Sequence, residues 1–134
     1  MATGGDIIEI TYNHATLGNG TIYGKAKEDS TFDLGGFRSE DDAAGVDGGG
    51  NMIDKITQSR WKFSVSVSWD MNSANELEKI SELAKSAVQA DWTIASINGT
   101  NWGGKGKPVG DYEGNGGAST FTLTLSGGGT LKKI

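Results

Sequence analysis

Cysteine is absent from the 134-residue chain, and histidine and proline each occur once. The absence of cysteine excludes disulfides, thiolate metal ligands and cysteine nucleophiles. The single histidine, His14, leaves little material for a zinc site or a proton shuttle. Basic residues are also few, since 12 Lys and Arg face 17 Asp and Glu. The net charge of −5 argues against a nucleic-acid binder, because such proteins gain affinity by neutralising phosphates.

Long apolar runs are missing as well. No stretch approaches the ~18 apolar residues of a membrane span. Residues 1–6 have neither the basic nor the apolar part of a secretory signal, so we expect a protein that stays in solution, with no membrane partner. The chain is long enough for one compact domain with a core and too short for two, so we expect residues 1–134 to form one domain.

Glycine is abundant, with 22 residues, and its doublets and triplets separate short segments that have the pattern of β-strands. In residues 61–69, aromatic residues and valine alternate with lysine and serine, which predicts a strand with one buried and one polar face. Residues 119–125 alternate in the same way, with threonine on the polar side. We expect these two strands to share a Ser/Thr-coated outer face. Further strands are predicted at residues 6–13, 20–24, 52–59, 91–97 and 129–134.

One segment departs from this pattern and predicts a helix at about residues 73–90. The sequence Ser73-Ala74-Asn75-Glu76 is a capping box. Six apolar residues then recur at helical spacing and predict a stripe that faces the core: Leu77, Ile80, Leu83, Ala84, Ala87 and Val88. The predicted fold is therefore mainly β, a β-barrel or rolled β-sandwich of antiparallel strands with one flanking α-helix.

Residues 25–51 differ from the rest of the chain, and we expect them to form a long, acidic, glycine-rich loop that serves interaction. A loop of this length is commonly functional or disordered. Within it, residues 28–50 carry seven acids against the lone Arg38: Glu28, Asp29, Asp33, Glu40, Asp41, Asp42 and Asp47. It also carries apolar anchors that need something to bury against: Phe32, Leu34, Phe37 and Val46. Two alternatives remain open here, a loop that folds back on its own barrel and a loop that reaches a neighbouring molecule.

Several motifs resemble catalytic or metal sites, but none has the residues it needs. Residues 99–105 have the spacing of a phosphate loop, but Gly106 replaces the hydroxyl residue and Pro108 opposes an immediate helix. Residues 41–48 resemble a calcium loop that lacks carboxylates at Ala43 and Gly45. His14 has no nucleophile elbow to serve, and we expect it on the surface at a strand end. We therefore expect no enzyme activity, no cofactor, no metal site and no small-molecule substrate.

The amino-acid sequence of the C-terminal third resembles that of a known family. Two segments resemble tail tube proteins of contractile-tailed bacteriophages. The first is residues 91–111, which contain the turn Gly106-Lys107-Pro108-Val109-Gly110-Asp111. The second is residues 120–134, which end in a Gly-rich segment followed by Leu-Lys-Lys. The resemblance is best over residues 51–134. It implies a barrel or rolled sandwich with one helix, similar to type VI secretion tube proteins, and it implies no catalysis.

This resemblance also implies an assembly. Six copies would form a ring, and stacked rings would form a hollow tube in the virion tail, assembled in the host cytoplasm. The partners would be other copies of the chain, sheath and baseplate proteins, and DNA that passes without specific binding. A long loop from the early strands would reach a neighbouring subunit, and the sheets of adjacent subunits would join around the lumen.

The residues are compatible with this assembly but leave its details open. Sheets joined edge to edge leave no exposed strand edges. Either Ser/Thr face could line a pore, and the acids of the loop could face the lumen or meet Lys132 and Lys133 on a neighbour. A monomeric carbohydrate-binding β-sandwich is an alternative, with Trp92 and Trp102 as stacking platforms and Trp61 and Trp69 in the core. A tail-completion or baseplate protein of the same fold is another.

Overall fold

The computed structural model describes residues 3–40, 45–70 and 76–134. Within these residues, nine strands form one antiparallel sheet, in the order β2-β1-β9-β10-β12-β8-β3, with β11 beside β12 and β13 beside β10. The strands of this sheet are β1 (Ile7–His14), β2 (Gly18–Tyr23), β3 (Ser30–Asp33), β8 (Trp61–Ser68), β9 (Ala90–Ser96), β10 (Asn101–Pro108), β11 (Gly114–Asn115), β12 (Thr120–Gly127) and β13 (Lys132–Lys133). Helix α1 spans Glu76–Lys85. The predicted mainly β, antiparallel fold with one helix is confirmed for the described residues.

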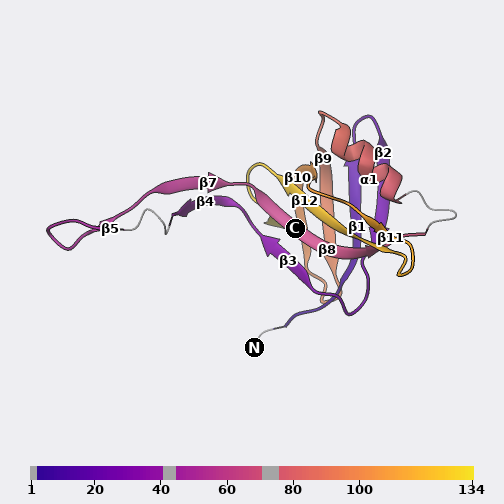
Figure 1. Ribbon diagram of the computed structural model, residues 1–134, viewed down its shortest axis with the longest axis horizontal. Coiled ribbons are helices and arrows are strands. Elements are labelled where there is room, and N and C mark those ends of the chain that lie inside the picture. Colours follow the sequence, from indigo (N-terminus) through magenta and orange to yellow (C-terminus); the bar gives the residue numbers. More distant parts are fainter. Residues whose placement is uncertain (1–2, 41–44, 71–75) are drawn as a thin grey trace.

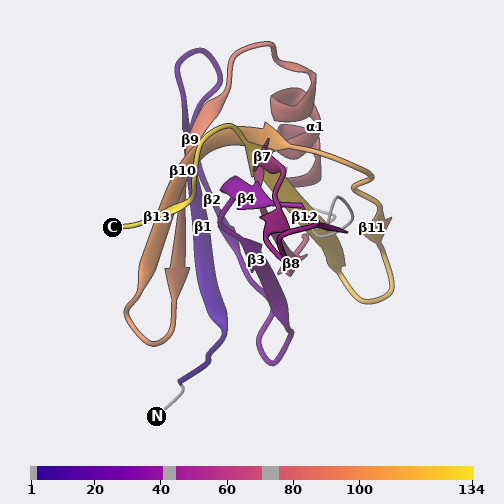
Figure 2. The ribbon, with the colours of Figure 1, turned by 90° about the vertical axis from the view of Figure 1, so that its left-hand side faces the viewer.

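The sheet is rolled and does not close into a barrel. Residues 101–106 of β10 pair with β9, whereas Lys107 and Pro108 pair with β12, so β10 joins the two halves of the sheet. The two halves approach each other again where an isolated bridge joins Gly24, just after β2, to Val67 of β8. Large apolar side chains from both halves fill the space between them, and α1 lies across one end of the roll (Figures 1 and 2).

The alternation that predicted β8 and β12 is confirmed. Trp61, Phe63, Val65 and Val67 are buried, whereas Lys62 is exposed. Strands β8 and β12 are antiparallel neighbours, and their register sets each serine of β8 opposite a threonine of β12. The shared Ser/Thr face is therefore present, and Ser64 and Thr124 lie within hydrogen-bond distance on it, 3.3 Å apart.

Strand β10 was not predicted, because its glycines carry no hydrophobic pattern. These glycines give room for two tryptophans. The indole N–H of Trp61 donates to the carbonyl of Lys105 at 3.1 Å, and that of Trp92 donates to the carbonyl of Gly106 at 2.9 Å. A Cβ at residue 106 would collide with the backbone carbonyl of Ser126 and lie 2.8 Å from the Trp61 ring. Gly103 and Gly104, which resembled part of a phosphate loop, therefore belong to β10, whereas Gly99 lies in the turn before it.

The helix is shorter than predicted at its C-terminal end, and its predicted residues 73–75 lie outside the described residues. Ile80 and Leu83 are buried as expected, but Ala87 and Val88 are exposed. The helix ends because Ser86 begins a turn, in which its hydroxyl oxygen accepts the N–H of Val88 at 3.1 Å. The chain then enters β9 at Ala90. Ala87 and Val88, the last two residues of the predicted apolar stripe, therefore lie outside the helix and do not face the core.

The segment 25–51 was expected to be one irregular loop, and this is wrong for much of its length. It contains β3, β4 (Gly36–Ser39) and β5 (Gly45–Val46). Strands β4 and β5 pair with β7 (Ile56–Ser59) and β6 (Met52–Ile53), so the predicted strand at 52–59 is divided in two. Strands β4 and β7 are distant in sequence, and β5 and β6 are only two residues long each, so local periodicity did not reveal these strands.

Candidate functional site

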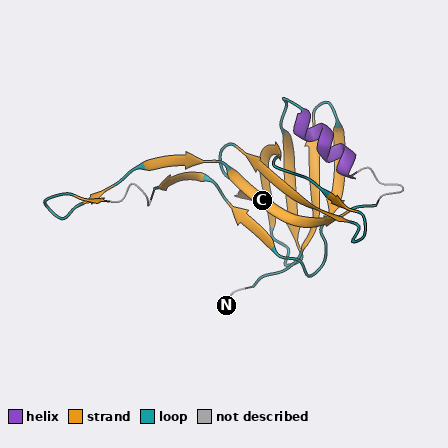
Figure 3. Cartoon of the chain, viewed as in Figure 1, coloured by secondary structure: helices purple, strands orange, loops and turns teal. Residues whose placement is uncertain are grey.

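A two-stranded ribbon projects from the body, and it is the candidate functional site. We call residues 36–40 and 45–59 the arm. It leaves the body after β3 and returns to it at β8 (Figures 1 and 3). Strands β4 and β7 form its base, the N–H of Glu40 continues the ladder by donating to the carbonyl of Lys55 at 2.8 Å, and β5 and β6 form its tip.

The arm is anchored where it leaves the body. The ring of Phe32 in β3 packs against Phe63, at 4.8 Å between ring centroids, and against Trp102, at 5.9 Å. The N–H of Leu131 donates to the carbonyl of Leu34 at 3.0 Å. Of the four predicted anchors, Phe32 therefore packs on its own body with its side chain 39% exposed, and Leu34 is tied to the body through its backbone with its side chain 44% exposed. Phe37 and Val46 lie on the arm.

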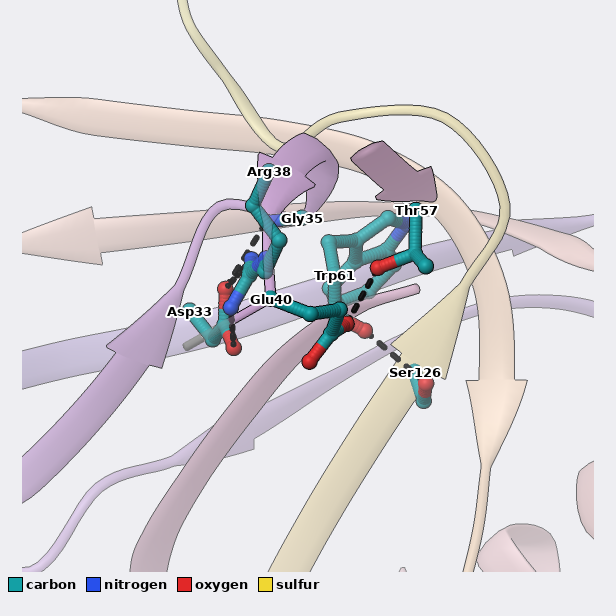
Figure 4. A network of polar contacts seen from close by, with 7 residues as sticks. All are labelled: Asp33, Gly35, Arg38, Glu40, Thr57, Trp61 and Ser126. Carbon is teal, nitrogen blue, oxygen red and sulfur yellow. Dashed lines mark hydrogen bonds and ion pairs between the residues drawn. The ribbon is translucent and has the colours of Figure 1, made fainter. Parts of the chain in front are cut away.

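An ion pair closes the root. The Asp33 carboxylate accepts hydrogen bonds from both terminal nitrogens of Arg38, at 2.7 and 3.2 Å, and from the N–H of Gly35 at 3.0 Å (Figure 4). These bonds, the Arg38 contact first, hold the pKa of Asp33 below its ordinary value of 3.8. Gly35 adopts a φ of 72°, which favours glycine. Arg38 therefore fixes the direction in which the arm leaves β3.

The two faces of the arm differ in polarity. The register pairs Phe37 with Gln58 and Ser39 with Ile56, which places Phe37 and Ile56 on one face, where they are 76% and 65% exposed. Arg38 and Thr57 pair on the other face, and there the Thr57 hydroxyl donates to the Glu40 carboxylate (Figure 4). The base of the arm is thus an amphipathic ribbon whose apolar face is open.

The tip of the arm is a tight turn organised by Asp47. Its carboxylate accepts the N–H groups of Gly49, at 2.9 Å, and Asn51, at 3.0 Å, and these bonds lower its pKa. Val46 and Met52 are paired beside this turn, and both are exposed. Asp47 therefore uses its carboxylate in turn formation, where the sequence resembled a calcium loop. Asp41 and Asp42 lie outside the described residues.

The other predicted acids also have local partners. Glu28 forms a 3.0 Å ion pair with Lys25, and Asp29 accepts the N–H of Ser30 at 3.2 Å. The acids therefore shape turns and the arm's root. At the other predicted interface, Lys132 and Lys133 are exposed in β13, paired with Gly103 and Trp102.

Sequence reasoning missed three exposed apolar residues of the arm: Met52, Ile53 and Ile56. They belonged to a predicted strand and gave no sign of exposure. Only the pairing of β4 with β7 shows that Ile56 shares a face with Phe37. The glycine-rich composition of residues 45–50 was a sequence signal for the tip of the arm, because it indicates a turn.

Two polar outer faces are available. One is the Ser/Thr face of β8 and β12. The other covers β1, β2 and β9, where Thr11 pairs with both Thr21 and Thr93. A shallow hollow of about 580 Å³ lies on this second face, with Asn13, Asn19 and Asp91 among its lining residues. The first face is rich in hydroxyl groups, and the second carries both hydroxyl and amide groups.

His14 ends β1 as expected, but it is buried, only 3% exposed, and this corrects the predicted surface position. Its Nδ1 accepts the N–H groups of Thr16 and Leu17, each at 3.0 Å, so its Nε2 carries the proton and donates to the carbonyl of Val88 at 3.0 Å. The ring thus fixes the β1–β2 turn against the segment that follows α1.

Other predicted sites are also placed by the structure. Among the described residues, no group of three or more His, Asp or Glu is arranged to hold a metal ion. No helix in the same part of the chain is long and apolar enough to cross a membrane. Trp92 is 1% exposed, so the expectation that it serves as a carbohydrate-stacking platform is wrong. Trp102 is half-buried against Phe32.

Comparisons with known proteins bear on the fold. No protein-family model and no curated protein matches the chain. Among solved structures, a chain of the anti-feeding prophage (AFP) baseplate, determined by cryo-electron microscopy with six-fold symmetry applied, aligns with a TM-score of 0.51. The alignment has 12% identity and covers 100% of this chain and 96% of that one.

The chain is similar in fold to a component of a prophage baseplate. At this identity the likeness concerns the fold alone. Since the alignment spans the whole chain, the arm lies within it as well as the body.

Proposed function

We propose that this protein is a structural, non-catalytic subunit of a phage-tail-like particle, that six copies form a ring, and that stacked rings form a tail tube whose lumen conducts DNA. The observation that carries the proposal is the amphipathic arm, because a ribbon that exposes Phe37 and Ile56 needs a second surface to cover them. The fold likeness to a chain of a six-fold baseplate adds support.

The polar outer faces suit a conduit. Hydroxyl and amide side chains on β8, β12, β1 and β9 offer DNA phosphates few cations, and the chain carries a net charge of −5. Two like charges about 4 Å apart repel by only ~1 kcal/mol in water, so such a surface lets DNA slide without acting as a gate. In this proposal the particle's sheath and baseplate proteins are the other partners.

Electron microscopy of the purified protein, with light scattering over a concentration series, tests the proposal. We expect six-fold rings that stack into tubes as the concentration rises. A protein that stays monomeric throughout would contradict it.

A matched variant tests the arm. Gly36 and Ser59 are paired, so residues 37–58 can be replaced by Asn-Gly, which closes a short hairpin. We expect native far-UV circular dichroism of the body together with loss of assembly. Tubes that form from this variant as readily as from the full chain would show that the arm is not the assembly element.

A single-ring role in a baseplate or at the end of a tail is the second candidate, and the baseplate neighbour favours it. The same micrographs separate the two roles. A tube subunit gives stacks of variable length, whereas a single-ring protein gives six-fold rings that do not stack at any concentration.

A further inference from the structure

His14 joins two parts of the chain that are far apart in sequence, and it uses both ring nitrogens to do so. The ring is 3% exposed at the end of β1. Its Nδ1 lies 3.0 Å from the N–H nitrogens of both Thr16 and Leu17 in the β1–β2 turn. Its Nε2 lies 3.0 Å from the Val88 carbonyl oxygen and 3.1 Å from the Ser86 hydroxyl oxygen, in the segment between α1 and β9. This turn and this segment lie at the same end of the roll (Figures 1 and 2).

This arrangement accommodates only the neutral form of the ring. A backbone N–H donates and cannot accept, so Nδ1 has to offer its lone pair to the turn. An imidazolium ion carries a proton on each nitrogen and has no acceptor. Proton uptake at Nδ1 would therefore break both bonds to the turn and leave a charge in a buried position. The bond from Nε2 to Val88 needs no change, so the β1–β2 turn is the part that proton uptake opens.

The surroundings of the ring supply no buried charge that could compensate the added proton. Residues 15–18 of the turn and residues 86–89 after α1 contain no ionisable side chain. On the inner face of β1, burial and the Glu82 carboxylate raise the pKa of Tyr12, so its phenol is neutral. Among the described residues no Asp, Glu, Lys or Arg side chain is buried. The neighbouring elements β2, β9 and α1 contribute exposed ionisable side chains: Tyr23, Asp91, Glu78, Lys79, Glu82 and Lys85.

We propose that His14 is an acid-sensitive latch between the β1–β2 turn and the segment that follows α1. An exposed imidazole takes up a proton near pH 6.5. The closed latch has no place for that proton, so the open state binds more protons and the closed state loses stability as the pH falls. The chain has one histidine and no cysteine, so no other side chain ordinarily changes charge between pH 5 and 8. The latch does not depend on the proposed assembly.

His14→Asn is a matched variant that removes the titration and keeps the acceptor. The side-chain oxygen of asparagine commonly accepts a backbone N–H two residues ahead, as in an Asx turn. It can therefore replace Nδ1 opposite Thr16, and it takes up no proton in this pH range. The variant loses the bond to Val88, so we expect it to be less stable than the unmodified chain at pH 7.5.

Hydrogen exchange followed by mass spectrometry, at pH 7.5 and pH 5.0, tests the latch in both full-length proteins. Rates are corrected for the pH dependence of exchange in an unstructured peptide, and the amides of β8 are the internal control. In the unmodified chain we expect protection of Thr16 and Leu17 to fall at least about 10-fold at pH 5.0, because the turn opens locally. We expect the midpoint of thermal unfolding to fall by about 4 °C or more. In His14→Asn both quantities should stay nearly constant.

The outcomes separate a latch from a merely structural histidine. Protection of Thr16 and Leu17 that is the same at both pH values would overturn the proposal, because the ring would then titrate without opening the turn. An equal fall in both proteins would also overturn it, since other groups would then cause the acid effect. If His14→Asn does not fold, the unmodified chain decides alone: loss of protection in the turn with β8 unchanged supports the latch, and a uniform loss contradicts it.

Discussion

Phe63 in the body and Phe37 in the arm are chemically identical side chains on paired antiparallel strands, yet the first is fully buried and the second is 76% exposed. Both strands have their backbone ladders. What differs is the second layer: β8 faces the opposite half of the rolled sheet, whereas the apolar face of the arm faces nothing in its own chain among the described residues.

The comparison teaches that strand pairing and burial are separate steps. Pairing satisfies backbone N–H and C=O groups, but only packing against another layer removes apolar area from water. An isolated two-stranded ribbon is marginally stable at best in water. The arm is anchored at its root by Phe32 and the Asp33–Arg38 pair, so its shape does not depend on pairing alone.

Truncation of the buried ring, Phe63, is expected to have the largest effect on stability. Phe63→Ala should lower the free energy of unfolding by about 3–5 kcal/mol, because it removes a buried ring and leaves a cavity in the core. Phe37→Ala should change it by less than about 0.5 kcal/mol, because that ring is exposed, while weakening assembly. Urea unfolding followed by tryptophan fluorescence measures the free energy of unfolding of both variants. Equal losses of stability would mean that the arm packs as part of the body.

Substitution of one glycine in the body and one in the arm should give a smaller difference in stability between the two regions. Gly106→Ala in β10 should destabilise by about 1–3 kcal/mol, because the new methyl group meets the Ser126 carbonyl and the Trp61 ring. Gly48→Ala at the arm tip has nothing within 4 Å of its Cβ. It should be neutral or raise stability by up to about 1 kcal/mol through the unfolded state. Thermal unfolding of both variants gives the difference, and a tolerated Gly106→Ala would refute the close packing around β10.

The smallest effect concerns the root of the arm and its pH dependence. The folded-state pKa of Asp33 is lowered, so the Asp33–Arg38 pair supports the root above the ordinary carboxyl pKa and is lost as pH falls through the lowered value. Arg38→Gln should raise the Asp33 pKa toward 3.8, as measured by NMR titration of its carboxyl group. The lowered pKa of Asp47 is set by backbone N–H groups at the tip and serves as the control. An Asp33 pKa that does not move would mean that Gly35 alone stabilises the carboxylate.

The strands that could be predicted were those with a clean alternation. Trp61, Phe63, Val65 and Val67 announce β8 because a period of two is a local property. The glycines of β10 carry no such period, and β4 and β7 acquire their faces only by pairing across a separation of about twenty residues. The apolar anchors of the loop were visible in sequence, but their division into Phe32 at the root and Phe37 on the open face was not.

Composition and local pattern by themselves determined that this chain would be a β-rich, acidic protein with one helix and without cysteine chemistry, because these properties depend on residue types and short spacings. Only the tertiary structure decided that the acidic segment is a paired arm, that His14 is enclosed, and that Ile8 and Ile56 face solvent. Strand register and bulges are set by contacts between residues far apart in the chain, and a shift of one residue reverses which side chains are buried.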